Sequence, residues 1–183
     1  MIQPNLNFKT KSIQVFLNQD IDINFSKTEA RKITFLEKEI IKILNFYNEE
    51  SIYLKKAEYC QGTCSFTFKK FVFPYFRKEV KHLTREQTML FVTQAAYFFG
   101  LTACGHIKNW NYSAIKFYEN IENEKMGFTD IIIKYKKFVE NKVDTALIFK
   151  AVNYRKLKDK IFGEINFELE KYCTGTLKFF IES

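Results

Sequence analysis

The sequence predicts an α+β domain in which an antiparallel sheet curves around one long apolar helix. Three observations lead to this class. The segment from Thr88 to Gly105 carries no charge, strand-like runs lie before and after it, and Gly and Pro are scarce, with 6 and 2 residues. A helix without a polar face needs cover on every side, and a curved sheet together with a partner subunit can provide it.

The chain of 183 residues favours a single domain, and the first part of the chain reads as an addition to it. Residues 1–27 hold two short alternating stretches and are interpreted as an N-terminal extension of a domain spanning 28–183. Thr28 is a candidate cap for a helix through Leu44, where apolar residues recur near helical spacing. Strand-like runs follow at 53–60 and 63–73, and Gly62 between them suits a tight hairpin.

A capping box opens the uncharged helix at Thr84. The Thr84 oxygen is expected to accept the backbone amide of Gln87, and the Gln87 side chain is expected to reach back. The segment is long enough to span a membrane, but Thr88, Thr93 and Gln94 interrupt it, so we favour a buried helix that ends at Gly105. A short helix at 113–123 and strands at 129–139, 145–154, 160–170 and 174–181 complete the pattern. This order is that of the hotdog architecture.

Charge and cysteine content limit the partners and the compartment. The chain has 29 Lys and Arg against 21 Asp and Glu, a net charge of +8, which favours nucleic acid, a membrane surface or an acidic protein. The basic residues are dispersed and no RNP-like motif or recognition helix is visible, so nucleic acid is not expected. The 4 cysteines do not form two well-spaced ligand pairs, so no metal and no cofactor are expected. Without a signal peptide, reduced thiols indicate the cytoplasm.

The polar residues around the start of the long helix form the best candidate site. A helix amino end offers unpaired amides and the positive end of the dipole, which can polarise a carbonyl. A thioester carbonyl bound there would become electrophilic, and His82 could move a proton. In the simpler interpretation Thr84 and Gln87 only cap the helix and His82 is a surface residue. The candidate residues are Tyr75, Arg77, His82, Thr84, Glu86, Gln87 and Gln94.

Residues 74–100, PYFRKEVKHLTREQTMLFVTQAAYFFG, resemble the FcoT-like family of hotdog proteins. Tyr75 and Arg77 match the tyrosine and arginine of the family's A-Y-I-R segment, and His82 matches the histidine of G-H-F-N. Gln94 and Tyr97 match its N-Q-L-A-Y helix motif. Upstream, Tyr47 in Leu-Asn-Phe-Tyr lies where the family has L-x-x-Y. The resemblance covers about residues 30–182.

The resemblance implies an enzyme of fatty acyl thioesters, linked in the family to isonitrile lipopeptide biosynthesis. The implied reaction adds glycine to the β-carbon of a (2E)-enoyl group on an acyl carrier protein. His82 would deprotonate the glycine ammonium, and Arg77 would pair with the glycine carboxylate. Tyr75 and Tyr47 would orient the reactants. The acyl chain would lie against Phe91, Phe98 and Phe99.

Two positions depart from the family pattern and keep other functions open. Thr84 replaces an asparagine, and Gln87 replaces an acidic residue, with Glu86 next to it. One alternative is a thioesterase for acyl-CoA or acyl carrier protein, with Glu86 or His82 as the base for water. The other is a non-catalytic module that binds lipid or an acyl carrier. A homodimer or higher homo-oligomer is expected, because hotdog subunits usually pair.

Overall fold

A single antiparallel sheet forms the framework of the computed structural model, which describes residues 33–60, 63–72, 80–103 and 114–182. The sheet has seven strands in the order β1-β2-β3-β5-β6-β7-β4. With three α-helices in the described part of the chain, the α+β class is confirmed. The strands are β1 (Ile33–Leu36), β2 (Leu54–Cys60), β3 (Thr63–Phe68), β4 (Met126–Tyr135), β5 (Thr145–Leu157), β6 (Lys160–Leu169) and β7 (Cys173–Glu182).

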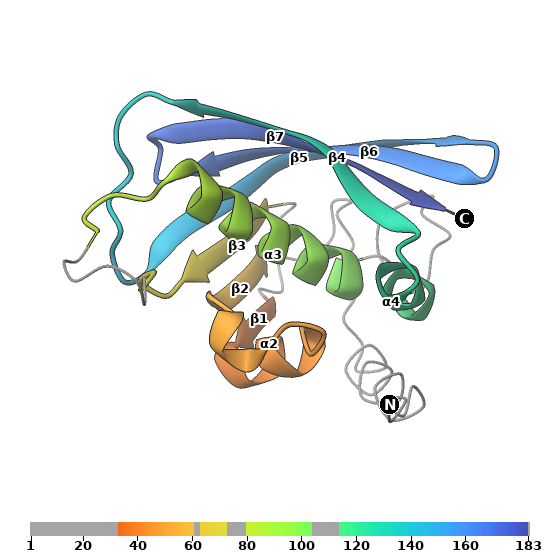
Figure 1. Ribbon diagram of the computed structural model, residues 1–183, viewed down its shortest axis with the longest axis horizontal. Helices are drawn as coiled ribbons and strands as arrows, with labels where there is room; N and C mark the ends of the chain where they lie inside the picture. Colours follow the sequence, from red (N-terminus) through yellow and green to blue (C-terminus); the bar gives the residue numbers. More distant parts are fainter. Residues whose placement is uncertain (1–32, 61–62, 73–79, 104–113, 183) are drawn as a thin grey trace.

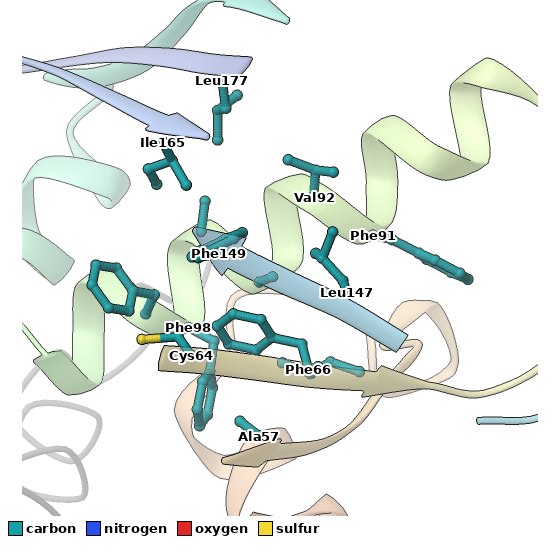
Figure 2. Packing of buried hydrophobic residues seen from close by; sticks show 14 of the residues in the cluster. Ala57, Cys64, Phe66, Phe91, Val92, Phe98, Leu147, Phe149, Ile165 and Leu177 are labelled. Atoms are coloured by element: carbon teal, nitrogen blue, oxygen red, sulfur yellow. The ribbon is translucent and has the colours of Figure 1, made fainter. Parts of the chain in front are cut away.

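The long helix α3 (Arg85–Ala103) lies against one face of this sheet (Figure 1). Rings and aliphatic side chains from both layers fill the space between them, as Figure 2 shows for Phe66 of β3, Phe91 of α3 and Phe149 of β5. Phe68 and Phe91 stack with ring centroids 4.2 Å apart. The uncharged segment is therefore a buried helix, and no helix of the described residues is long and apolar enough to span a membrane.

Two shorter helices flank α3. Helix α2 (Glu37–Ile43) follows β1 directly, and its Glu39 carboxylate accepts the Leu36 amide at 2.9 Å. Helix α4 (Ala114–Glu122) packs on α3 where Gly100 leaves room for the Phe117 ring, which a Cβ at that position would overlap. A one-turn 3-10 helix (Glu49–Ser51) leads into β2. Figure 1 places α4 near the carboxyl end of α3.

The first helix differs from the sequence prediction. Residues 33–36, expected to be helical, form β1 instead and pair with β2, Ile33 opposite Tyr59 and Leu36 opposite Lys56. Ile33, Thr34 and Phe35 are β-branched or aromatic, so they fit a strand once β2 is available to pair with them. The predicted cap Thr28 and the extension 1–27 lie outside the described residues, as does the predicted helix stop Gly105.

Several strand limits also move. The strand predicted at 129–139 runs from Met126 to Tyr135, because from Lys136 onward the chain turns toward the α3 amino end. The strand predicted at 63–73 ends at Phe68, and the described residues 69–72 are not part of a strand. The segment at 145–154 extends to Leu157, where Lys158 with φ 55 turns the chain into β6. These shifts keep the predicted order of elements and bring residues 136–141 beside the candidate site.

Candidate functional site

The amino end of α3 is closed by the predicted capping box. The Thr84 amide donates to Gln87 Oε1 at 2.8 Å, and the Gln87 amide donates to Thr84 Oγ1 at 3.4 Å. Gln87 is only 2% exposed, and its Nε2 is buried without a hydrogen-bond partner among the described residues. Buried donors are nearly always paired in folded proteins, so this nitrogen needs an acceptor from a ligand or water. It is the single atom at this helix end that indicates binding.

Tyr135 brings the end of β4 onto the same helical turn. Its hydroxyl lies 2.9 Å from Thr88 Oγ1 and 3.4 Å from the Thr84 carbonyl oxygen. Burial raises the pKa of Tyr135 above its ordinary value, while the hydrogen bond with Thr88 lowers it. The hydroxyl is therefore a neutral group at neutral pH. Neither Tyr135 nor Thr88 is a predicted site residue, because strand alternation alone does not show which tyrosine meets the helix.

His82 lies at the surface just before the helix. Two backbone hydrogen bonds of 2.8 Å hold its segment, from Leu83 N to the Val139 oxygen and from Asn141 N to the Lys81 oxygen. The imidazole stacks on Phe138 with ring centroids 5.1 Å apart and an interplanar angle of 27°. The ring is thus held next to the helix end and is open to solvent.

The Asn141 side chain ties together two segments on either side of the predicted Tyr75 and Arg77. Its Oδ1 accepts the Phe71 amide at 2.9 Å, and its Nδ2 donates to the Phe71 oxygen at 2.8 Å and the Val80 oxygen at 3.0 Å. Tyr75 and Arg77 themselves lie outside the described residues. Asn141, 4% exposed, was not predicted as a site residue, and no local sequence signal distinguishes it from other loop asparagines.

Glu86 is an exposed carboxylate on the first turn of α3. Hydrogen bonds with its own backbone amide and then with the Thr84 side chain hold the pKa of the Glu86 carboxyl below its usual value. The group is ionised at neutral pH, and the lowered pKa makes it a weaker base than an ordinary glutamate. Thr84, Glu86 and Gln87 therefore share one helical turn, with His82 two residues before it.

Tyr47 contacts the middle of α3 instead. The centre of its ring lies 4.9 Å from that of Phe46 and 6.3 Å from that of Tyr97. Burial, and to a smaller extent the nearby Tyr97, raises the pKa of Tyr47 to about 12, although a hydrogen bond with Thr93 lowers it. Thr93 is six residues beyond Gln87, roughly 9 Å along the helix axis. The structure therefore places Tyr47 on a different part of α3 from the capping box.

Gln94 fixes the helix to the chain that enters β2. Its Oε1 accepts the amides of Tyr53 at 3.0 Å and Leu54 at 3.3 Å, and its Nε2 donates to the Ser51 oxygen at 2.6 Å. The side chain is completely buried, and both its oxygen and its nitrogen form hydrogen bonds. Of the two roles considered, fixing the helix accounts for every polar atom, and the ligand-orienting role stays a prediction.

The three phenylalanines expected to line an acyl site pack within the core. Phe91 stacks on Phe68, Phe98 meets Phe35 edge-on at 5.3 Å, and Phe99 meets Phe149 at 5.8 Å. All three α3 rings are at most 4% exposed. An acyl chain would have to displace these ring contacts, so the role of the three rings in acyl binding stays a prediction.

A groove of about 600 Å³ lies beside the His82 loop. Phe138 and Glu140, from the segment that pairs with residues 81–83, form part of its wall, and Tyr172 forms another part. The groove is therefore continuous with the surface around His82. Its lining carries both signs of charge, including Lys137, Lys142 and Lys171 with Glu140, Glu168 and Glu170.

No family model matches the chain, and no curated protein matches it significantly. Among solved structures, the chain is similar to a gentisyl-coenzyme A thioesterase, with 15% identity, 64% of this chain and 84% of that chain covered, and a TM-score of 0.38. A hypothetical thioesterase of Streptococcus pneumoniae with coenzyme A shows 11% identity over 66% and 79% of the two chains, with a TM-score of 0.36.

A DHNA-CoA thioesterase from Staphylococcus aureus is similar at 14% identity, over 66% of this chain and 73% of that chain, with a TM-score of 0.34. These neighbours are described as thioesterases. At TM-scores this low they assign neither a family nor an activity to the chain, so a functional proposal has to rest on the residues at the amino end of α3.

Proposed function

We propose that the chain is a hotdog enzyme that acts on a fatty acyl thioester bound at the amino end of α3. The observation that carries this proposal is the buried Nε2 of Gln87, which has no partner among the described residues. Placed at the positive end of a 19-residue helix, this donor is suited to a carbonyl oxygen that gains negative charge during reaction. The Thr88 and Tyr135 hydroxyls add polarity on the same turn.

The first candidate reaction is the addition of glycine to a (2E)-enoyl thioester, which the resemblance to the FcoT-like family favours. His82 would take a proton from the glycine ammonium, and the amine nitrogen would then attack the β-carbon. The resulting enolate oxygen would be stabilised by Gln87 and the helix end until the α-carbon is protonated. Arg77 would hold the glycine carboxylate and Tyr75 would orient the reactants, whereas Tyr47, which contacts the middle of α3, would act there only on a more distant part of the substrate.

Hydrolysis is the second candidate, and Glu86 favours it. Its ionised carboxylate is exposed to solvent on the turn that carries Gln87, although the lowered pKa makes it a weaker base than an ordinary glutamate. Glu86 or His82 would take a proton from water, which attacks the thioester carbon and releases the thiol. A non-catalytic acyl-binding module is the third candidate, supported by Thr84 and Gln87 where the family has asparagine and an acidic residue. We further propose a homo-oligomer that takes acyl carrier protein or acyl-CoA as partner.

One experiment separates these functions. Purified protein is incubated with a medium-chain (2E)-enoyl acyl carrier protein, with and without glycine, and the carrier is weighed by mass spectrometry. A mass gain of one glycine supports addition, and release of the free acid supports hydrolysis. Binding without either change would leave only the non-catalytic module. His82→Ala should abolish turnover in a protein that still folds, and an unchanged rate would remove His82 from the mechanism.

A further inference from the structure

Five cationic side chains surround the amino end of α3, and we call them the basic collar: Lys81, Arg85, Lys136, Lys137 and Lys171. All five are exposed, and none forms an ion pair with another residue in the described part of the chain. Several lysines elsewhere on the sheet are paired, such as Lys55 with Asp144 at 2.8 Å, whereas Lys134 on β4 is exposed without an ion pair among the described residues. The collar therefore places five unpaired positive charges around the amino end of α3.

Backbone contacts bring the members of the collar together. Lys136 N donates to the Tyr172 oxygen at 2.8 Å, which places Lys136 beside the turn that carries Lys171. The Lys137 ammonium lies 5.9 Å from the centre of the Tyr172 ring. On the other side, the Lys81 oxygen accepts the Asn141 amide at 2.8 Å. The collar therefore joins the β4–β5 loop, the β6–β7 turn and the approach to α3.

Arg85 completes the collar on the helix itself. It is the first residue of α3, next to Thr84, whose carbonyl oxygen lies 3.4 Å from the Tyr135 hydroxyl. The charges of Glu86 and Arg85 both act on Tyr135, the last residue of β4 before Lys136 and Lys137, which places Arg85 near these two lysines. Figure 1 shows the start of α3 and the loop between β4 and β5 at the same end of the sheet.

Exposed aromatic rings lie among these charges. Phe138 is 80% exposed and stacks on His82, and Tyr172 is 46% exposed. Both rings line the groove of about 600 Å³ that also contains Lys137 and Lys171. Aromatic anchors within a rim of charge are typical of surfaces that bind another protein, because the rings supply affinity and the charges steer the encounter.

We propose that the basic collar, with Phe138 and Tyr172 at its centre, is the docking surface for an acidic acyl carrier protein that delivers its thioester to the amino end of α3. This inference rests on the proposed function, since it assumes a carrier-bound substrate. The carboxylates of Glu140, Glu168 and Glu170 in the same groove would repel the continuous phosphate backbone of a nucleic acid. A folded acidic protein can place its separate carboxylates opposite the cations and avoid these three positions.

Carrier binding is measured directly, without turnover, so that the docking proposal is tested independently of the proposed enzymatic function. The full chain is titrated with an acidic acyl carrier protein that holds a dodecanoyl chain through a stable amide, and affinity is followed by fluorescence anisotropy. In Lys136→Glu/Lys137→Glu we expect affinity to fall by about tenfold or more, because two attractive charges become repulsive. The loss should shrink as salt is raised from low to physiological ionic strength.

Lys125→Glu/Lys158→Glu is the matched control. It makes the same change in net charge at two exposed lysines, and Lys158 lies in the β5–β6 turn, away from the start of α3 in Figure 1. Its affinity for the carrier should equal that of the unchanged chain. Turnover of the matching short acyl-pantetheine, which lacks the carrier, should be equal in all three proteins.

Three outcomes would overturn the docking surface. They are equal carrier binding by the collar variant and the unchanged chain, equal loss in the control, or tighter binding of a single-stranded oligonucleotide than of the carrier. If the chain turns over acyl-CoA but does not bind the carrier, the docking surface fails and the thioester function stands. If the carrier binds at the collar but no thioester is turned over, docking stands and the proposed enzyme fails.

Discussion

Gln87 uses the two ends of its amide group differently. Its oxygen accepts the Thr84 amide at 2.8 Å and caps α3, while its nitrogen is buried without a partner in the described structure. An unpaired buried donor costs about 1–3 kcal/mol of stability. A ligand oxygen that approaches this nitrogen would recover that energy, so the same residue that closes the helix can favour substrate binding.

Replacing the amide nitrogen without disturbing the cap tests this second role. Gln87→Glu keeps an oxygen for the Thr84 amide and removes the NH2 donor. Turnover of the acyl thioester should fall about a hundredfold, because one donor to a developing oxyanion is worth that much in rate. The measurement is kcat/KM beside the free energy of unfolding from a urea titration.

Gln87→Met is the companion variant, since it fills a similar volume and removes both polar atoms. It should lose the same activity with little net change in stability, because removal of the unpaired nitrogen offsets the lost bond to the Thr84 amide while the Thr84 hydroxyl still accepts the amide of residue 87. Full activity in Gln87→Glu would show that the nitrogen does not contact the substrate and would leave Gln87 as a cap only.

At this scale, sequence and structure agree where the interaction is local. Thr84 and Gln87 are three residues apart, so their pairing follows from helix geometry and could be predicted. Tyr135 could not, because its hydroxyl reaches Thr88 from a strand that lies 47 residues further along the chain. The same holds for Asn141, which bonds to Phe71 across 70 residues.

Helix α3 is fixed at its centre by a polar contact inside an apolar environment. Gln94 binds the backbone of Ser51, Tyr53 and Leu54, just where the chain enters β2. These backbone amides and this carbonyl need hydrogen-bond partners, because they face the buried Gln94 side chain. Hydrophobic packing alone would allow α3 to slide or rotate, whereas three hydrogen bonds set one position.

Gln94→Leu should therefore cost far more than its gain in hydrophobicity. The substitution leaves two amides and one carbonyl without their side-chain partner, and we expect the free energy of unfolding to fall by about 3 kcal/mol. Thr93→Ser, at the adjacent residue, keeps its hydroxyl and should cost less than about 1 kcal/mol. Urea unfolding compares them, and equal losses in both variants would mean that the Gln94 bonds do not hold the helix.

A helix or strand could be predicted from the sequence where its own hydrophobic pattern is enough to identify it. The amphipathic strands β6 and β7 and the helix α3 were expected close to where they lie. Strand β1 was not, because its four residues continue the apolar spacing of α2 and become a strand only by pairing with β2. The junction at Leu36 therefore depends on a tertiary contact that local spacing does not contain.

At the scale of the whole molecule, the interior ionisable groups among the described residues are tyrosines and thiols that stay neutral. Burial raises the pKa of Cys64 to about 12 and that of Cys173 to about 11. Burial and the nearby Tyr97 together raise the pKa of Tyr47 to about 12. At alkaline pH these groups therefore keep their protons in the folded protein but lose them in the unfolded chain, so the free energy of unfolding depends on pH in that range.

The sign of this linkage follows from the protons. Below pH 9, near the ordinary cysteine value of 9.0, these groups are protonated in both states and their contribution is fully present. As pH rises toward 12, the unfolded chain loses its protons first, so the free energy of unfolding should decrease. The contribution of these groups is lost as pH passes their pKa values in the folded protein, about 11 to 12. Tyr47→Phe should flatten the part of the decline above pH 10, the ordinary tyrosine value, because phenylalanine has no proton to hold. Urea midpoints of the unchanged chain and of Tyr47→Phe, measured at intervals from pH 8 upward, test this. If the midpoints of both proteins fall equally steeply above pH 10, Tyr47 is ionised as easily in the folded protein as in the unfolded chain.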